Sequence, residues 1–294
     1  MLRPVVAGID GSRESLAAAD WAAREAQRRG TPLSVIHSWE WPPRGVPNFD
    51  DSDTQRFRAE RILRNAEQEL RKRYPELAIE ARMTPDPPVP GLLDIAEDAE
   101  LLVLGSRGLS GFAGFLVGSV GLATVSRATC PVVLVRAEER RADEHLPDAE
   151  GRPSTATPHS KVVLGIDVTH PCEEILEFAF DAAARRSAPL QAVHVWRAPL
   201  PYAAVDAGPE TLAEAERALT VALHPWQEKF PGVQVFEDAV TGGTGSRLLE
   251  VASGASLLVV GRRLHRPAFA PRLGVVTHAV LHHALCPVAV VPHA

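Results

Sequence analysis

Short apolar runs alternate with amphipathic stretches along the first 136 residues. The apolar runs, which predict buried strands, are residues 3–9, 33–39, 77–83, 101–105 and 131–136. Helical spacing of apolar residues predicts helices between them, over 12–30, 54–73, 91–99 and 119–128. Strands that alternate with helices pair in parallel, and strands covered on both faces are apolar throughout. The pattern therefore predicts an α/β fold, a five-stranded parallel open sheet with helices on both faces.

The whole pattern occurs twice in the chain. VVAGIDGS at 5–12 returns as VVLGIDVT at 162–169, so that Asp10 corresponds to Asp167. LLVLGSR at 101–107 likewise returns as LLVVGRR at 257–263. A repeat of this length is far longer than a solenoid unit, so each copy is expected to be a complete domain.

The boundaries follow from the repeat. We predict a first domain over 1–140, a linker over 141–157 and a second domain over 158–294. The segment between the copies is charged and then rich in Pro, Ser and Thr, without apolar periodicity. This composition is typical of a flexible linker.

Composition excludes several classes of protein. The formal net charge of −6 argues against a nucleic-acid surface, and no apolar run approaches the ~20 residues of a membrane span. The start, MLRPVVAGID, lacks the features of a signal peptide. The 3 cysteines are odd in number and match no metal motif, which indicates a reduced compartment. We expect a cytoplasmic protein that binds neither nucleic acid nor membranes.

The string GSRGLSGFAGFLVGS at 105–119 carries the most informative chemistry. Gly105, Gly108 and Gly118 let a backbone approach phosphate oxygens, because no Cβ stands in the way. Backbone N–H groups near Ser119 would form an anion nest, and Arg107 would add a permanent positive charge. On spacing alone, a phosphate site and a set of tight turns both remain open.

This glycine pattern after the fourth strand, with Asp10 closing the first strand, resembles the ATP-binding class of bacterial universal stress proteins, and does so over nearly the whole chain twice. The resemblance implies a Rossmann-like fold of the adenine-nucleotide α-hydrolase-like group. It also implies ATP as the ligand, with or without Mg²⁺. By resemblance, Asp10 contacts the adenosine, Ser38 lies beside the base, and the glycine loop lines the ribose and phosphates. The implied binding residues are Gly8, Asp10, Ser12, Ser38, Gly105, Arg107, Gly108, Gly118, Ser119 and Val120.

The second copy departs from this pattern. Asp167, Gly261 and Gly274 are kept, but Leu264 stands at the place of Gly108 and Val275 at that of Ser119. The intervening prolines, 267 and 271, lack a backbone N–H. These changes oppose phosphate binding. An adenosine-shaped pocket around Asp167, or an anion held by the arginines of this loop, remains open.

Some candidate residues also have simpler structural interpretations. Asp10 alone could cap the helix that follows it. His278 and His282 have the i, i+4 spacing of a metal pair but no third ligand, so an exposed helix face is preferred and no metal site is assigned. His37 and His194 lie in equivalent strands, and histidines with satisfied nitrogens are favoured over catalytic ones.

Three functions compete at this point. The first is a nucleotide-dependent regulatory or stress-response factor with an unknown protein partner. The second is a slow ATPase, but no catalytic residue is assigned, because the loop has no carboxylate or histidine to orient water. The third is an interaction module without nucleotide. We also expect the two copies to pair as an intramolecular pseudo-dimer, since the strands at 131–136 and 287–292 would otherwise expose a sheet edge. A homodimer stays open.

Overall fold

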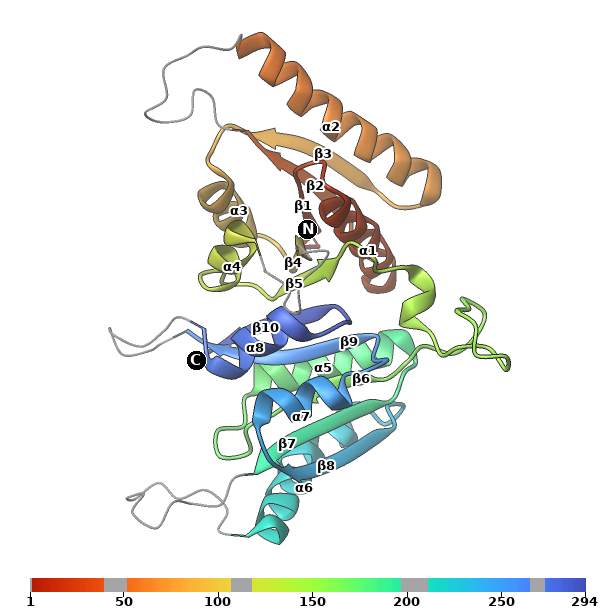
Figure 1. Cartoon of the computed structure of the whole chain (residues 1–294), viewed down its shortest axis with the longest axis vertical. Helices are drawn as coiled ribbons and strands as arrows, with labels where there is room; N and C mark the ends of the chain where they lie inside the picture. The colour runs from red at the N-terminus through yellow and green to blue at the C-terminus, as the bar shows by residue number, and fades with distance from the viewer. Residues whose placement is uncertain (1, 40–51, 107–117, 197–210, 265–272) are drawn as a thin grey trace. The chain divides into compact units, whose positions relative to one another are not determined.

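The chain forms two compact units, Met1–Arg140 and Arg141–Ala294 (Figure 1). The computed structural model describes residues 2–39, 52–106, 118–196, 211–264 and 273–294. In each unit these residues contain one sheet of five parallel strands. The predicted α/β fold with two tandem domains is therefore confirmed.

The first unit alternates strands and helices in the order predicted. Its elements are β1 (Val5–Ile9), α1 (Arg13–Arg29), β2 (Leu33–Ser38), α2 (Ser52–Arg73), β3 (Ile79–Thr84), α3 (Pro88–Ala96), β4 (Leu101–Ser106), α4 (Ser119–Val125) and β5 (Val132–Arg136). The strand order is β3-β2-β1-β4-β5, and every neighbouring pair is parallel. Helices α1 and α2 cover one face of the sheet, and α3 and α4 cover the other (Figure 1).

The second unit repeats this arrangement. Its elements are a 3₁₀ turn (Arg141–Glu144), β6 (Val162–Gly165), α5 (Glu173–Arg186), β7 (Leu190–Trp196), α6 (Leu212–Lys229), β8 (Val235–Thr241), α7 (Thr244–Val251), β9 (Leu257–Arg263), α8 (Val275–His283) and β10 (Val288–His293). The strand order is β8-β7-β6-β9-β10, again parallel throughout. The matching order in both units is the structural counterpart of the sequence repeat.

The core of each sheet consists of apolar strand residues. In the first unit, Val5 and Val103 on the adjacent strands β1 and β4 have no exposed surface. In the second, Val163 and Val259 on β6 and β9 are equally buried. Continuous burial explains why these strands are apolar at every position rather than at alternate ones.

Local signals for α1 are confirmed, whereas the boundary predicted for α3 is wrong. The Ser12 hydroxyl accepts a hydrogen bond from the Ser15 N–H at 3.2 Å and caps α1, and Gly30 ends the helix with φ 66°. Helix α3 begins at Pro88, three residues before the predicted start at 91. Prolines are among the added residues, and proline fits the first turn of a helix, where its missing N–H costs nothing.

The segment predicted to be a flexible linker is held by hydrogen bonds instead. His145 and His159 form an antiparallel bridge with their rings stacked at 4.1 Å, and the Leu146 N–H donates to the Pro158 carbonyl. Between them, the Asp148 carboxylate accepts the backbone N–H of Arg152 at 2.8 Å. Turns of this kind need no apolar periodicity, which is why composition alone did not reveal them.

Candidate functional site

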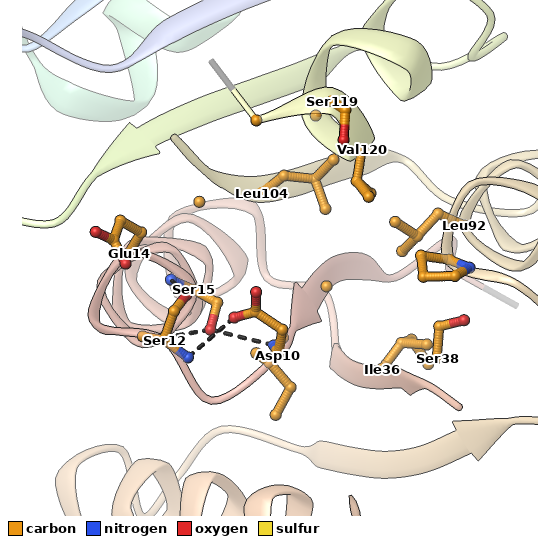
Figure 2. Close-up of a pocket in the computed structure, with 16 residues that line it drawn as sticks. Asp10, Ser12, Glu14, Ser15, Ile36, Ser38, Leu92, Leu104, Ser119 and Val120 are labelled. Atoms are coloured by element: carbon orange, nitrogen blue, oxygen red, sulfur yellow. Dashed lines mark hydrogen bonds between the residues drawn. The ribbon is translucent and has the colours of Figure 1, made fainter. Parts of the chain in front are cut away.

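The strand order reverses between β1 and β4, and a cavity of about 220 Å³ opens at the carboxyl ends of these strands. A crevice at this point is where open α/β sheets bind ligands. The predicted site residues that line it are Gly8, Asp10, Ser12, Ser38, Gly105, Gly118, Ser119 and Val120 (Figure 2). The other two, Arg107 and Gly108, lie outside the described residues.

The turn between β1 and α1 places Asp10 at the cavity. The carboxylate of this exposed residue accepts the Ser12 N–H at 2.9 Å, while the Asp10 N–H donates to the Ser15 hydroxyl at 3.2 Å (Figure 2). Gly11 has φ 81°, a backbone conformation that favours glycine. Ser12 is thus the residue that caps α1, and Asp10 closes the turn before the cap.

Apolar side chains form a slot beside Asp10. Ile36, Leu92 and Leu104 line the cavity together with Pro88 (Figure 2). Ile36, Leu92 and Leu104 all fall within predicted elements, but none was predicted to be a site residue. The Ser38 hydroxyl at the edge of the slot donates to the backbone carbonyl of Asp86, so it is already engaged within the protein.

Packing against α1 is enough to require a glycine at position 105. A Cβ at this position would lie 2.6 Å from the Glu14 carbonyl carbon and 2.7 Å from the Ser15 nitrogen, both in the backbone of α1. At Gly8, a Cβ would lie 2.6 Å from a methyl group of Leu104. These two glycines allow α1 and the Leu104 side chain to pack closely, and the role predicted for Gly105 beside a phosphate stays a prediction.

The start of α4 forms the opposite wall of the cavity. Gly118 precedes the helix with extended backbone angles, φ −58° and ψ 149°. Ser119 follows, and Figure 2 shows its side chain next to that of Val120. The Ser119 hydroxyl therefore supplies a hydrogen-bond donor on the side of the cavity from which the glycine loop leaves.

The second unit has an equivalent cavity of about 340 Å³. Gly165, Asp167, Gly261 and Val276 line it at the places of Gly8, Asp10, Gly105 and Val120. Helix α5 begins at Glu173, three residues later than the repeat predicts from α1. His170 and Cys172 stand at the mouth in place of that missing turn.

The Asp167 carboxylate has more polar partners than a simple turn requires. Its carboxylate accepts the Thr169 hydroxyl at 2.6 Å and the Thr169 N–H at 3.1 Å. Arg263 and His170 lie 3.8 and 3.7 Å from its second oxygen. Burial raises the pKa of Asp167, but the bonds from Thr169 and the imidazoles of His170 and His194 outweigh it, so the pKa lies below its ordinary value.

The strand histidines behave as predicted. The Nδ1 atom of His37 lies 2.8 Å from the Ile9 carbonyl, and that of His194 lies 3.1 Å from the Ile166 carbonyl. Each imidazole thus bridges two adjacent strands. His278 is exposed, and its ring centroid lies 4.3 Å from that of His282. Within the described ranges, no group of three potential metal ligands occurs.

A family model agrees with this double architecture. The model of the universal stress protein family matches residues 1–136 and again 159–292. The chain belongs to the universal stress protein family. A universal stress protein of Mycobacterium tuberculosis is 35% identical over 97% of this chain and 96% of its own, and another from that organism is 32% identical over 97% and 95%.

Solved structures of universal stress proteins share the fold. One from Archaeoglobus fulgidus covers 99% of this chain and 98% of its own, with a TM-score of 0.70 and 16% identity. A shorter universal stress protein, solved in complex with cAMP, is 30% identical over 46% of this chain with a TM-score of 0.38. That complex is a property of the relative. Among the helices described here, none is long and apolar enough to cross a membrane.

Proposed function

We propose that the first unit binds ATP and that this universal stress protein acts as a nucleotide-dependent regulatory or stress-response factor. One observation supports this more than any other. The cavity at the strand-order reversal brings an apolar slot, the Asp10 carboxylate and the Ser119 hydroxyl together within the first unit. These are the three kinds of group that a base, a ribose and a phosphate require.

Each part of the cavity suits one part of the nucleotide. The slot formed by Ile36, Leu92 and Leu104 suits the planar base. A carboxylate such as that of Asp10 accepts hydrogen bonds from ribose hydroxyls. Ser119 lies where the glycine loop leaves, so its hydroxyl would meet a phosphate, with Arg107 assigned to the same end by family resemblance.

The residues of the cavity favour ATP binding without efficient ATP hydrolysis. Besides Asp10, Glu14 is a carboxylate that lines the cavity, and it was not among the predicted site residues. In Figure 2 its side chain lies apart from the Ser119 hydroxyl, at the far side of the first turn of α1. A group that orients water for attack on a terminal phosphate must reach that phosphate. The acidic residues 50, 51 and 53 follow β2 in the sequence and would be further candidates for holding Mg²⁺ or water, but their side chains lie outside the described residues.

Calorimetric titration of ATP into the full chain and two matched variants tests the proposal. Gly118→Val places a branched side chain in the first cavity, and Gly274→Val makes the same change at the equivalent place in the second unit. We expect Gly118→Val to abolish ATP binding and Gly274→Val to preserve it. Unchanged affinity in a folded Gly118→Val protein would refute the site. The cytoplasmic location, the pairing of the two copies and a protein partner remain predictions.

A further inference from the structure

The second cavity keeps the apolar part of the first one. Val193, Val195, Leu248 and Val260 line it at the places of Ile36, Ser38, Leu92 and Leu104. Val195 replaces Ser38 and Thr244 replaces Pro88, so the aliphatic side chains of the slot are kept while its polar position changes. A volume of about 340 Å³ falls at the small end of the ~300–1,000 Å³ found for small-molecule sites.

At the end of β9, the place that corresponds to the predicted phosphate site of the first unit, the backbone forms strand hydrogen bonds instead. Strands β9 and β10 pair as far as Arg263 and His293, and the next amide, that of Leu264, donates to the His293 carbonyl at 2.7 Å. Leu264 stands at the place of Gly108. The Leu264 N–H is therefore hydrogen-bonded within the sheet and is not available to a phosphate.

The side chains on the phosphate side have changed as well. Val275 begins α8 at the place of Ser119, with 84% of its surface exposed and no hydroxyl to donate. Arg263 lies 3.8 Å from the Asp167 carboxylate, which offsets its charge. Burial and the nearby Arg263 lower the pKa of His293, so this imidazole is neutral at pH 7. None of these three side chains would attract a polyanion strongly.

Polar groups suited to hydroxyls are nevertheless present. The Asp167 carboxylate stays ionised at neutral pH and lies next to the slot. His170 and Thr244 line the same cavity, and both can donate and accept hydrogen bonds. A carboxylate beside side chains that both donate and accept hydrogen bonds suits a sugar diol better than a phosphate chain.

We propose that the second cavity binds an uncharged nucleoside, with the ring in the aliphatic slot and the sugar hydroxyls on Asp167, and that it excludes nucleoside triphosphates. This inference rests on the proposed function, because the slot is assigned to a base through its equivalence with the first cavity. The protein would then sense two ligands, a triphosphate in one unit and a dephosphorylated nucleoside in the other.

Titration of adenosine, guanosine, cytidine and uridine into the full chain saturated with ATP tests the proposal. The matched variants are Asp167→Ala and Asp10→Ala, since both residues lie in turns outside the buried core. We expect at least one nucleoside to bind in the presence of ATP. Asp167→Ala should weaken that binding by about tenfold or more, because it removes a charged acceptor, whereas Asp10→Ala should change it less than about twofold. ATP affinity should fall in Asp10→Ala and change little in Asp167→Ala.

Three outcomes would overturn the proposal. They are the absence of binding by all four nucleosides at millimolar concentration, their displacement by ATP, and a loss of ATP binding in Asp167→Ala as large as that in Asp10→Ala. Failure of the proposed function looks different, because ATP would then bind nowhere while Asp167-dependent nucleoside binding persisted. Leu248→Phe, which enlarges a residue of the slot and keeps the Asp167 carboxylate, should also abolish nucleoside binding. Unchanged binding in that folded variant would contradict the assignment of the slot.

Discussion

Gly105 and Gly261 occupy the same place in the two units, near the end of β4 and of β9, yet they face different neighbours. A Cβ on Gly105 would meet the backbone of α1, whereas a Cβ on Gly261 would meet the side chains of Ile175 at 2.4 Å and His293 at 2.9 Å. One glycine allows a helix to approach a strand, and the other allows two side chains to fill the space. The comparison teaches that a glycine shared by two copies of a motif need not serve the same purpose in both.

The difference originates at the start of the following helix. Pro171 stands at the place of Glu14, and a residue that precedes proline is disfavoured in the helical region. Helix α5 accordingly begins only at Glu173, after Cys172 with φ −125° and ψ 122°. The lost turn leaves room for Ile175 and His293 beside Gly261 and brings His170 to the mouth of the cavity. One proline thus changes both the packing and the chemistry of the second site.

The largest expected effect is on stability. Gly105→Ala should lower the free energy of unfolding of the first unit by about 3 kcal/mol, at the upper end for overpacking, because a helix backbone must move. Gly261→Ala should cost the second unit about 1 kcal/mol, because side-chain ends can shift. Native-state hydrogen exchange, read separately in β4 and β9, measures both values. Equal losses of unfolding free energy in the two units would contradict the different packing roles of Gly105 and Gly261.

A smaller effect is expected on ligand affinity. Ser119→Ala should weaken ATP binding by about 1–3 kcal/mol, roughly 5- to 150-fold, because one donor to a charged acceptor is lost. Val275→Ala, the matched change in the second unit, should leave ATP affinity unchanged. Calorimetry on the full chain compares them directly. If both variants bound ATP as tightly as the unmodified chain, Ser119 would have no part in the site.

The smallest effect concerns pH. Because the pKa of Asp167 is lowered on folding, its contribution to stability is present above the unfolded value of about 3.9 and is lost as pH falls through the folded pKa. The side chain is 56% exposed, so solvent screening keeps this contribution below about 1 kcal/mol. Asp167→Asn should therefore be less stable than the unmodified chain at pH 7 and equally stable near pH 2, as measured by urea unfolding. Thr169→Val removes one bond to the carboxylate, so its loss of stability at pH 7 should be smaller than that of Asp167→Asn. A loss of stability that grew towards acid pH would contradict the lowered pKa of Asp167.

The architecture was predictable because its signals are periodic and repeated. Apolar runs located the strands of both sheets, and Ser12 and Gly30 marked the ends of α1 correctly. The gathering of Asp10, Gly105 and Ser119 at one cavity followed from parallel strands, whose carboxyl ends share one edge. The start of α3 at Pro88 was missed, because proline marks both loops and first helical turns.

Other features depend on contacts that spacing does not encode. The packing role of Gly105 follows from how closely α1 approaches β4, and the backbone bond from Leu264 to His293 follows from the length of the β9–β10 pairing. Both join residues that are distant in sequence. The later start of α5 had a local signal in Pro171, which was visible in the sequence but was not used.

Native mass spectrometry of the full chain at saturating ATP tests the central claim most directly, because it counts ligands on each molecule. The intact first cavity and the altered second one predict a single ATP per chain, which disappears in Gly118→Val and persists in Gly274→Val. Two ATP molecules per chain, or one that survives Gly118→Val and is lost in Gly274→Val, would contradict the division of roles between the two units.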